Sequence, residues 1–164
     1  KITAYGEVST IAGSTYGFAD GTSTTAQFHY PTDICIGSSD GRIYIADANN
    51  DRIRVLQNTY VSTLVGSGKK SFAEGIGVKA NLWTPKGIVV FGDNIYVNDN
   101  SNYRIRKINS SFQTSTYAGG KTGYKDGDSL LAQFSGMQGI TADKNGVIYV
   151  ADSGNNKIRK IVLE

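Results

Sequence analysis

Few side chains in this sequence could carry out catalysis, because the 164 residues include one histidine, His29, and one cysteine, Cys35. A zinc site needs more nitrogen or sulfur ligands than this pair supplies. A serine–histidine–aspartate triad that used His29 would lack the Gly-x-Ser-x-Gly turn that exposes such a nucleophile. No glycine cluster precedes a helical segment, so no phosphate-binding loop is indicated. The sequence therefore predicts no metal, no cofactor and no catalytic residue.

Three aspartates each stand five residues before a cation, which places the two charges across a hairpin loop. One interpretation is a charged rim that binds a ligand. The other is structural: the aspartate accepts loop N–H groups and pairs with the returning cation. Repetition favours the structural interpretation. The pairs are Asp47 with Arg52, Asp99 with Arg104, and Asp152 with Lys157.

Three acid–glycine dipeptides could suggest calcium loops: Asp20–Gly21, Glu74–Gly75 and Asp126–Gly127. Calcium requires several oxygen ligands in close spacing, and each of these segments offers only one or two acids. We therefore expect turns at these positions.

Aromatic side chains with polar tips are the best candidates for a binding role. Phe18, Phe72 and Tyr124 occupy matching positions and are expected to pack beneath their own loops. Ring-bearing residues that do not recur are better candidates for ligand contacts, because loops carry the variable part of a binding protein. These residues are Tyr16, His29, Tyr30, Trp83 and Tyr103.

Composition narrows the classes of partner. The formal net charge is +3 and no run of Lys or Arg exceeds two residues, which argues against nucleic acid. No apolar run approaches the roughly 18 residues of a membrane span. Abundant Ser, Thr, Tyr and Asn, with one N-glycosylation sequon at Asn109–Ser111, favour an extracellular or secreted protein, although the compartment stays open. The first residue is lysine, so we expect a mature chain or a piece of a longer one.

The sequence contains three copies of one pattern. The segment Val8–Gly13 returns as Val61–Gly66 and again as Thr114–Gly119. Each unit holds four short β-prone runs, separated by Gly, Asn and Asp residues that supply turns. Four-stranded units at a period of about 50 residues, without a helical pattern, indicate the blades of a β-propeller. We expect a single all-β domain over 1–164, with an outermost strand at 7–13 and units at about 14–66, 67–119 and 120–164.

Three motifs recur in these units in one order: Phe-x-x-Pro-x-x-Ile, then Gly-x-Ile-Tyr-Val-Ala-Asp, then Asn-x-Arg-Ile-Arg-Lys. The combination resembles the NHL repeat and spans all three units. Met137 in place of proline, Asn98 in place of alanine and Lys157 in place of the first arginine are departures expected to affect local packing. The long segment Gly13–Ala26 is similar to an extended NHL subclass.

The resemblance implies a six-bladed propeller, of which this chain supplies three blades. In that family the run after the proline is innermost, and the Val-Ser-Thr run is outermost. The long Gly-rich loop and the short Asp-x-x-Asn loop would then open on one face, together with the candidate aromatic residues. NHL-like lyases use histidine-rich metal sites, which a single histidine cannot supply.

The ends of the sequence motivate an expectation about assembly. Lys1–Ile2 matches Lys107–Ile108 and Lys160–Ile161, which are the tails of third strands. An outermost strand, Glu7–Gly13, follows, whereas the third unit stops without its own. We expect a head-to-tail homodimer in which each Glu7–Gly13 strand completes the last blade of the other chain. Neighbouring blades of a parent protein, or an open filament, are the alternatives.

Three functions follow in order of support. The first is a non-catalytic binding or scaffold module that recognises a protein or a glycan. The second is an RNA-binding propeller, as some NHL proteins are; this needs a continuous basic face, which the acids of the same loops dilute. The third is an enzyme such as a lyase or hydrolase, and fold alone decides none of these. The lysines available to RNA are Lys69, Lys70, Lys86, Lys121 and Lys125.

Overall fold

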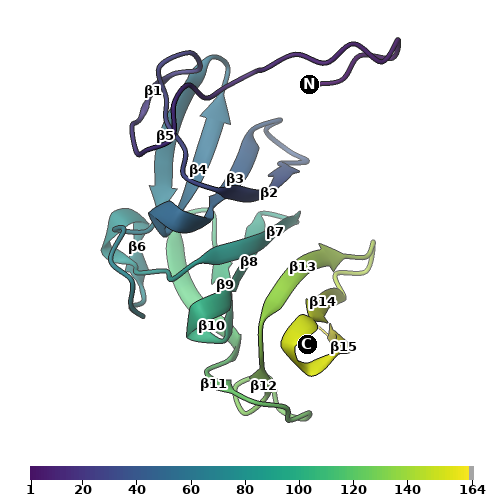
Figure 1. Ribbon diagram of the computed structural model, residues 1–164. Helices are drawn as coiled ribbons and strands as arrows, with labels where there is room; N and C mark the ends of the chain where they lie inside the picture. Colours follow the sequence, from purple (N-terminus) through teal and green to yellow (C-terminus); the bar gives the residue numbers. More distant parts are fainter. Residues whose placement is uncertain (163–164) are drawn as a thin grey trace.

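Successive β-sheets form an arc in the computed structural model, which describes residues 1–162 (Figure 1). Largely apolar runs such as Ile43–Asp47 and Pro85–Phe91 become strands because they can be covered on both faces. Short turns separate the strands, with glycines in the positive-φ conformation. The prediction of an all-β chain with propeller-type sheets is confirmed.

The first two sheets share one topology. The first has the order β1-β5-β4-β3-β2, and the second has the order β6-β10-β9-β8-β7. The first contains β1 (Gly21–Thr22), β2 (Pro31–Ile36), β3 (Ile43–Asp47), β4 (Arg52–Gln57) and β5 (Tyr60–Val65). The second contains β6 (Gly75–Ile76), β7 (Pro85–Phe91), β8 (Asn94–Asp99), β9 (Arg104–Ile108) and β10 (Gln113–Gly119).

The four longer strands of each sheet follow the predicted order, from the run after the proline to the Val-Ser-Thr run. The expectation of four strands per sheet is incomplete, because the long loop adds a fifth strand, β1 or β6, outside the Val-Ser-Thr strand. Sequence patterns missed these strands because two residues are too few to show an alternation.

The third sheet has three strands, β13 (Met137–Ala142), β14 (Ile148–Asp152) and β15 (Lys157–Ile161). A short parallel pair, β11 (Lys121–Thr122) and β12 (Gln133–Phe134), lies in the preceding loop. Residues 163–164 lie outside the described residues. The 3-10 turns are η1 (Ala48–Asn50), η2 (Gly77–Lys79), η3 (Asn100–Asn102) and η4 (Ser153–Asn155).

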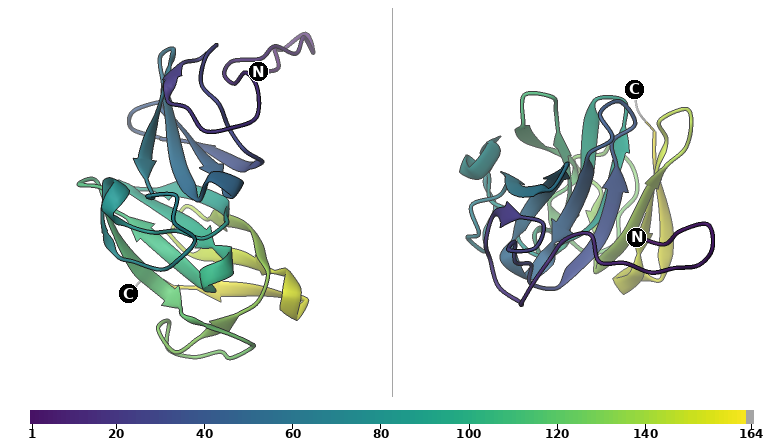
Figure 2. Two further views of the ribbon diagram at one scale, coloured as in Figure 1. Left: turned by 60° about the vertical axis from the view of Figure 1, so that its left-hand side comes forward. Right: turned by 90° about the horizontal axis from the view of Figure 1, so that it is seen from above.

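The strands β2, β7 and β13 lie next to one another and form the inner side of the arc (Figures 1 and 2). Polar side chains bridge them. The backbone N–H of Ile88 donates to Asp33 Oδ2 over 2.9 Å, and Asn98 Nδ2 donates to the carbonyl oxygen of Gln138 over 2.9 Å. Asn98, which stands where the other units have alanine, therefore ties the second sheet to the third.

Two of the three core clusters consist of apolar side chains between adjacent sheets, and the third, with Ile45, Leu56 and Val61, lies between the first sheet and its own long loop. Met137, in the position of the missing proline, is fully buried in the core. Each such side chain contributes about 1.5–3 kcal/mol by leaving water. The cluster between the first and second sheets includes Ile53, Val55, Leu82 and Ile88, and the cluster between the second and third includes Tyr96, Ile105, Phe134 and Ile148.

The N-terminal segment forms an arm that extends from the first sheet, and Ala12 packs against that sheet at the base of the arm (Figures 1 and 2). Within the arm, Ile2 forms an antiparallel bridge with Val8, and the backbones of Lys1 and Ser9 exchange hydrogen bonds. The expected outermost strand at 7–13 pairs at its start with residues 1–3, and at its end the N–H of Gly13 donates to the carbonyl oxygen of Ser23 over 2.8 Å. Val8 is 79% exposed.

Candidate binding face

A buried ion pair organises the loops of each unit. Asp47 Oδ2 lies 2.8 Å from Nη1 of Arg54, and both side chains are fully buried. The predicted pairing of Asp47 with Arg52 is wrong, since the partner lies two residues further along β4. The same correction applies to the other units, where the pairs are Asp99 with Arg106 and Asp152 with Arg159 rather than Arg104 and Lys157.

Asp47 pairs with Arg54 rather than Arg52 because the two guanidinium groups reach different acceptors. Arg52 stands opposite Asp47 in the strand register, but its guanidinium donates to the carbonyl oxygens of Asn50 and Ser67. Arg54 projects on the same side of β4 and reaches the buried Asp47 carboxylate. A buried carboxylate needs a fully paired cation, so the inner arginine takes this role.

The buried arginine also holds the long loop in place. Arg54 donates through Nη2 to the carbonyl oxygen of Ala19 over 2.8 Å and through Nη1 to that of Gln27 over 3.0 Å. Arg106 and Arg159 make equivalent bonds to their own loops. Because these acceptors belong to the backbone, the loop side chains can vary without disturbing the loop.

The acid of each acid–glycine dipeptide anchors the loop to the sheet. Asp20 Oδ1 accepts from Arg54 Nη2, and the N–H of Thr63 donates to Asp20 Oδ2 over 3.1 Å. In the second unit the N–H of Thr116 donates to Glu74 Oε1 over 2.8 Å. These contacts give the carboxylates a structural role at the turn. The sequence predicted the turns but not the hydrogen-bond partners of the carboxylates.

The recurring aromatic residues stack against the cations of the repeat. The Arg52 guanidinium carbon lies 3.8 Å from the ring centroid of Phe18, and Arg104 lies 3.9 Å from that of Phe72. The rings are about half exposed, at 45% and 42%. The expectation that they pack beneath their loops therefore holds only on one side, since the outer arginine covers each ring in a cation–π contact.

His29 and Trp83 occupy matching positions, and they define what we call the loop face: the long loops with η1, η3 and η4. The N–H of His29 donates to Asp47 Oδ1 over 2.8 Å, and the N–H of Trp83 donates to Asp99 Oδ1 over 2.8 Å. The carbonyl oxygens of both residues accept from the neighbouring 3-10 turn. The buried aspartates thus hold both residues on the same face.

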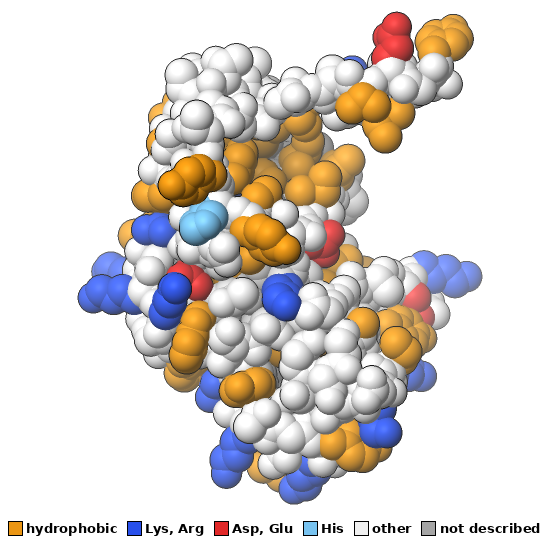
Figure 3. All heavy atoms as spheres, viewed as in Figure 1, with side chains coloured by type: hydrophobic (Ala, Val, Ile, Leu, Met, Phe, Trp, Pro, Cys, Tyr) orange, Lys and Arg blue, Asp and Glu red, His pale blue; other side chains and the backbone are white. Residues whose placement is uncertain are grey.

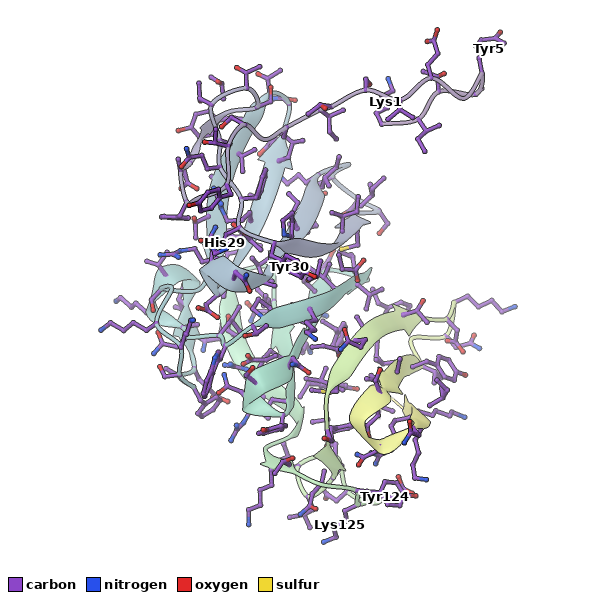
Figure 4. The ribbon with its side chains drawn as sticks, in the orientation of Figure 1. Lys1, Tyr5, His29, Tyr30, Tyr124 and Lys125 are labelled. Atoms are coloured by element: carbon purple, nitrogen blue, oxygen red, sulfur yellow. The ribbon has the colours of Figure 1, made fainter. Side chains whose placement is uncertain are left out.

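The structure brings three of the five candidate residues together in the first unit. The rings of Tyr16 and His29 lie 5.7 Å apart between centroids, and Tyr30 follows His29 directly (Figure 4). Tyr16 is 83% exposed. Trp83 and Tyr103 belong to the second unit, beside η3, and are more covered.

Tyr30 has an unusual backbone. Its φ is 57°, in the left-handed region, and the matching positions are Thr84 at 53° and Gly136 at 60°. A side chain other than glycine is strained there, so the tyrosine is held by its surroundings. It is nevertheless 70% exposed, which means that burial of its ring does not account for its presence.

A groove of about 980 Å³ lies beside β15, and our sequence-based site prediction did not include it. It is bounded by β15, by the loop from Tyr124 to Ser129, and by Tyr117 and Ala118 of β10. Figure 4 labels Tyr124 and Lys125 on the loop at its edge.

Two titratable groups outside the ion pairs have strongly raised pKa values. Burial, with the nearby Asp33 charge, raises the pKa of the Cys35 thiol to about 12, so the thiol is protonated and weakly reactive near neutral pH. Burial and the hydrogen bond to Asp40 raise the pKa of Tyr44 to about 12. Among residues 1–162 no three His, Cys, Asp or Glu side chains gather as a metal site would require. No helix in that range is long and apolar enough to cross a membrane.

Sheets with adjacent inner strands and loops gathered on one face define a propeller-type repeat protein. The family model of the NHL repeat matches residues 28–56 and 134–161, in the first and third units. The chain is an NHL-repeat domain of the propeller type, as its motifs predicted.

Similar proteins carry this domain within longer chains. Protein SUPPRESSOR OF QUENCHING 1, chloroplastic, of Arabidopsis thaliana is 35% identical over 87% of this chain and 15% of its own length. NHL repeat-containing protein 2 of Bos taurus is 26% identical over 82% of this chain and 20% of its own length. The crystal structure of an auxiliary nutrient binding protein from Bacteroides thetaiotaomicron matches 87% of this chain and 39% of that chain, with 25% identity and a TM-score of 0.71. This chain therefore spans a minor part of each.

Proposed function

We propose that this chain is a non-catalytic binding module whose loop face recognises a protein or a glycan. One contrast carries the proposal: buried ion pairs hold the loop backbones in the same way in every unit, while the exposed aromatic residues differ between units. Rigid loops with variable aromatic side chains are suited to recognition. The likeness to an auxiliary nutrient binding protein supports a binding role.

The ligand contacts in this proposal are the five candidate residues on the loop face. Tyr30 is the strongest, because it combines high exposure with a strained backbone. Trp83 and Tyr103 would extend the surface to the second unit. The full set is Tyr16, His29, Tyr30, Trp83 and Tyr103.

A ligand from a glycan array or a peptide display library makes this testable. Replacing Tyr30, Trp83 and Tyr103 together by alanine is expected to weaken binding by about 100-fold, as loss of a hot-spot cluster does. Lys144→Ala and Asp93→Ala, on exposed hairpins outside the loop face, serve as the control and should leave affinity unchanged. Intact affinity in the triple variant, with loss in the control, would refute the site.

RNA binding is the alternative, and salt dependence separates the two. Binding of single-stranded RNA that weakens steeply as the salt concentration rises would favour the exposed lysines over the aromatic residues as the site. Binding to a neutral glycan should depend little on salt. Turnover of any lyase or hydrolase substrate would show that the chain is an enzyme and would contradict both binding functions.

We also propose that two chains associate head to tail, so that six sheets close one ring. Exposed apolar residues on the first sheet support this: Ile34 is 60% exposed, whereas its counterpart Ile88, which the first sheet covers, is 2% exposed. Figure 3 shows hydrophobic side chains gathered beside the arm on this part of the molecule. Light scattering of the intact chain should give the mass of a dimer, and a stable soluble monomer would contradict the association.

A further inference from the structure

One set of positions on the loop face carries different side chains in each unit, although the backbone around it is the same. In every unit the buried aspartate of the ion pair accepts a backbone N–H over 2.7–2.8 Å, and the donors are His29, Trp83 and Ser135. The carbonyl oxygens of these donors accept an N–H from the 3-10 turn, given by Asn49, Ser101 and Gly154. The repeat therefore presents equivalent residues at the same points of the surface.

A further equivalent position lies in the long loop. Tyr16, Lys70 and Thr122 match because the residue after each accepts a hydrogen bond from the last asparagine of the neighbouring 3-10 turn. With the left-handed position of Tyr30, Thr84 and Gly136, each unit has four such points. The first unit fills them with Tyr16, His29, Tyr30 and Asn49, the second with Lys70, Trp83, Thr84 and Ser101, and the third with Thr122, Ser135, Gly136 and Gly154.

The third unit folds with small residues at all four points, so the fold does not account for the three rings and the amide of the first unit. The backbone strain at Tyr30, where the third unit has Gly136, is not offset by burial of the tyrosine ring. Side chains that are costly, exposed and confined to one repeat point to a ligand.

The four side chains of the first unit form what we call the tyrosine–histidine cluster: Tyr16, His29, Tyr30 and Asn49. The rings of Tyr16 and His29 are tilted by 51° with their centroids 5.7 Å apart, and Asn49 Nδ2 lies 3.4 Å from His29 Nε2. Figure 3 shows the histidine at the surface with hydrophobic side chains on either side, and Figure 4 labels His29 beside Tyr30. Because both backbone polar groups of His29 are hydrogen-bonded, the imidazole is held in place.

The polar atoms of the cluster remain available to a ligand. When Asn49 donates to Nε2 of His29, the ring proton is on Nδ1, which can donate to a hydroxyl group. The Oδ1 atom of Asn49 can accept, and each phenol can do both. Tyrosine rings provide apolar faces beside these groups.

The cluster itself carries no carboxylate and no lysine or arginine. The Asp47 carboxylate beneath it is paired with Arg54 and accepts from the N–H of His29, so its charge is already compensated. The second unit differs, because it has Lys70 where the first has Tyr16. The first unit is therefore suited to an uncharged ligand that has both an apolar face and hydroxyl groups.

We propose that the tyrosine–histidine cluster binds one neutral sugar ring of a glycan. A C–H face of the pyranose lies against an exposed tyrosine ring, and its hydroxyl groups bond to His29 and Asn49. This inference rests on the proposed function, and it narrows the ligand to a glycan and its anchor to the first unit. A protein hot spot fills a desolvated pocket, whereas Tyr16 and Tyr30 are open, at 83% and 70% exposed.

The chain has one histidine and one tryptophan, so each gives a single set of side-chain NMR signals. The probes are methyl glycosides of neutral hexoses, pentoses and N-acetylhexosamines, added singly up to about 50 mM because one sugar ring on an open surface binds weakly. At least one should shift the imidazole signals of His29 saturably and leave the indole N–H of Trp83 unchanged. A methyl uronide should bind no more tightly, and shifts that glycerol reproduces at the same concentration would overturn the site.

Variants then test the contacts with the glycoside that binds. Tyr16→Ala and Tyr30→Ala should each weaken binding about tenfold through loss of the ring, and Asn49→Ala about three- to tenfold through loss of a hydrogen bond. Thr122→Ala and Ser135→Ala, at the equivalent points of the third unit, are the matched controls and should stay within about twofold. Tyr16→Phe, which keeps the ring, should lose less than Tyr16→Ala. Equal losses in the cluster and in the controls would overturn the proposal.

The outcomes separate this inference from the proposed function. A glycoside that shifts Trp83 but not His29 would overturn the sugar site in the first unit and leave recognition by the loop face intact. If no glycoside gives a saturable shift while a peptide from a display library binds the loop face, the ligand is a protein and the sugar site is wrong. If neither glycosides nor peptides bind there, both proposals fail.

Discussion

At the scale of single residues, the two arginines of each repeat differ in environment although they are two positions apart. Arg54 is fully buried against Asp47, whereas Arg52 is partly exposed over the ring of Phe18. A buried ion pair contributes little net stability, but breaking one leaves an uncompensated charge in the core. The two positions should therefore respond very differently to mutation.

Arg54→Ala is expected to lower the free energy of unfolding by about 3–5 kcal/mol, because it leaves the buried Asp47 carboxylate without its partner. Arg52→Ala, the matched control, should cost about 1 kcal/mol through lost hydrogen bonds and ring contact. Urea denaturation followed by circular dichroism measures both. Similar losses for the two variants would show that the ion pair is not the organising contact.

Tyr30 should show a trade between stability and binding. Tyr30→Gly is expected to raise the free energy of unfolding by about 0.5–1 kcal/mol, because glycine adopts positive φ without steric cost and the ring is mostly exposed. The same change should weaken ligand binding at the loop face. Denaturation and titration of one protein sample measure both effects, and a destabilised variant would contradict the strain at Tyr30.

At the scale of secondary-structure elements, the arc depends on how closely the inner strands approach. A Cβ atom at Gly87 of β7 would collide with the carbonyl oxygen of Gln138 on β13, and nothing lies within 4 Å of a Cβ at the matching Gly139. An added side chain is therefore unfavourable at Gly87, where two sheets meet, but not at the matching Gly139. The polar bridge from Asn98 to Gln138 holds the same junction.

Gly87→Ala is expected to destabilise the chain by about 1–3 kcal/mol, as overpacking does when backbone must move. Gly139→Ala should change stability by less than about 0.5 kcal/mol, because its Cβ would occupy open space. Thermal and urea melts at low protein concentration compare the two. If both variants were equally stable, the inner strands would not be in the close contact described.

At the scale of the whole molecule, the arc has an arm beyond the first sheet and a groove beside the third, and the proposed association would bring such ends of two chains together. Head-to-tail surfaces of this kind close a ring when the rotation allows and otherwise form filaments. In the proposed association, two chains would together supply the six sheets of one ring.

The melting temperature should therefore rise with protein concentration, since association stabilises the folded state by mass action. A tenfold dilution series in a calorimeter measures this. A melting temperature that is independent of concentration in the parent chain would argue against the ring.

The sequence by itself determined the all-β class and the three repeated units, because local apolar runs and turn residues recur with one period, whereas the order of the long strands was implied by the resemblance to the NHL repeat. It also identified Asp47 as a structural residue. The NHL motifs allowed these local patterns to be placed in a propeller-type domain.

Only the tertiary structure decided which contacts those residues make. It paired Asp47 with Arg54 rather than Arg52, because burial and reach depend on the folded hairpin and not on spacing alone. It added β1 and β6, whose pairing comes from a loop folding back over a distant strand. It also revealed which residues line the groove at β15, since Tyr117, Asp126 and Ile158 are far apart in the sequence and come together only in the folded chain.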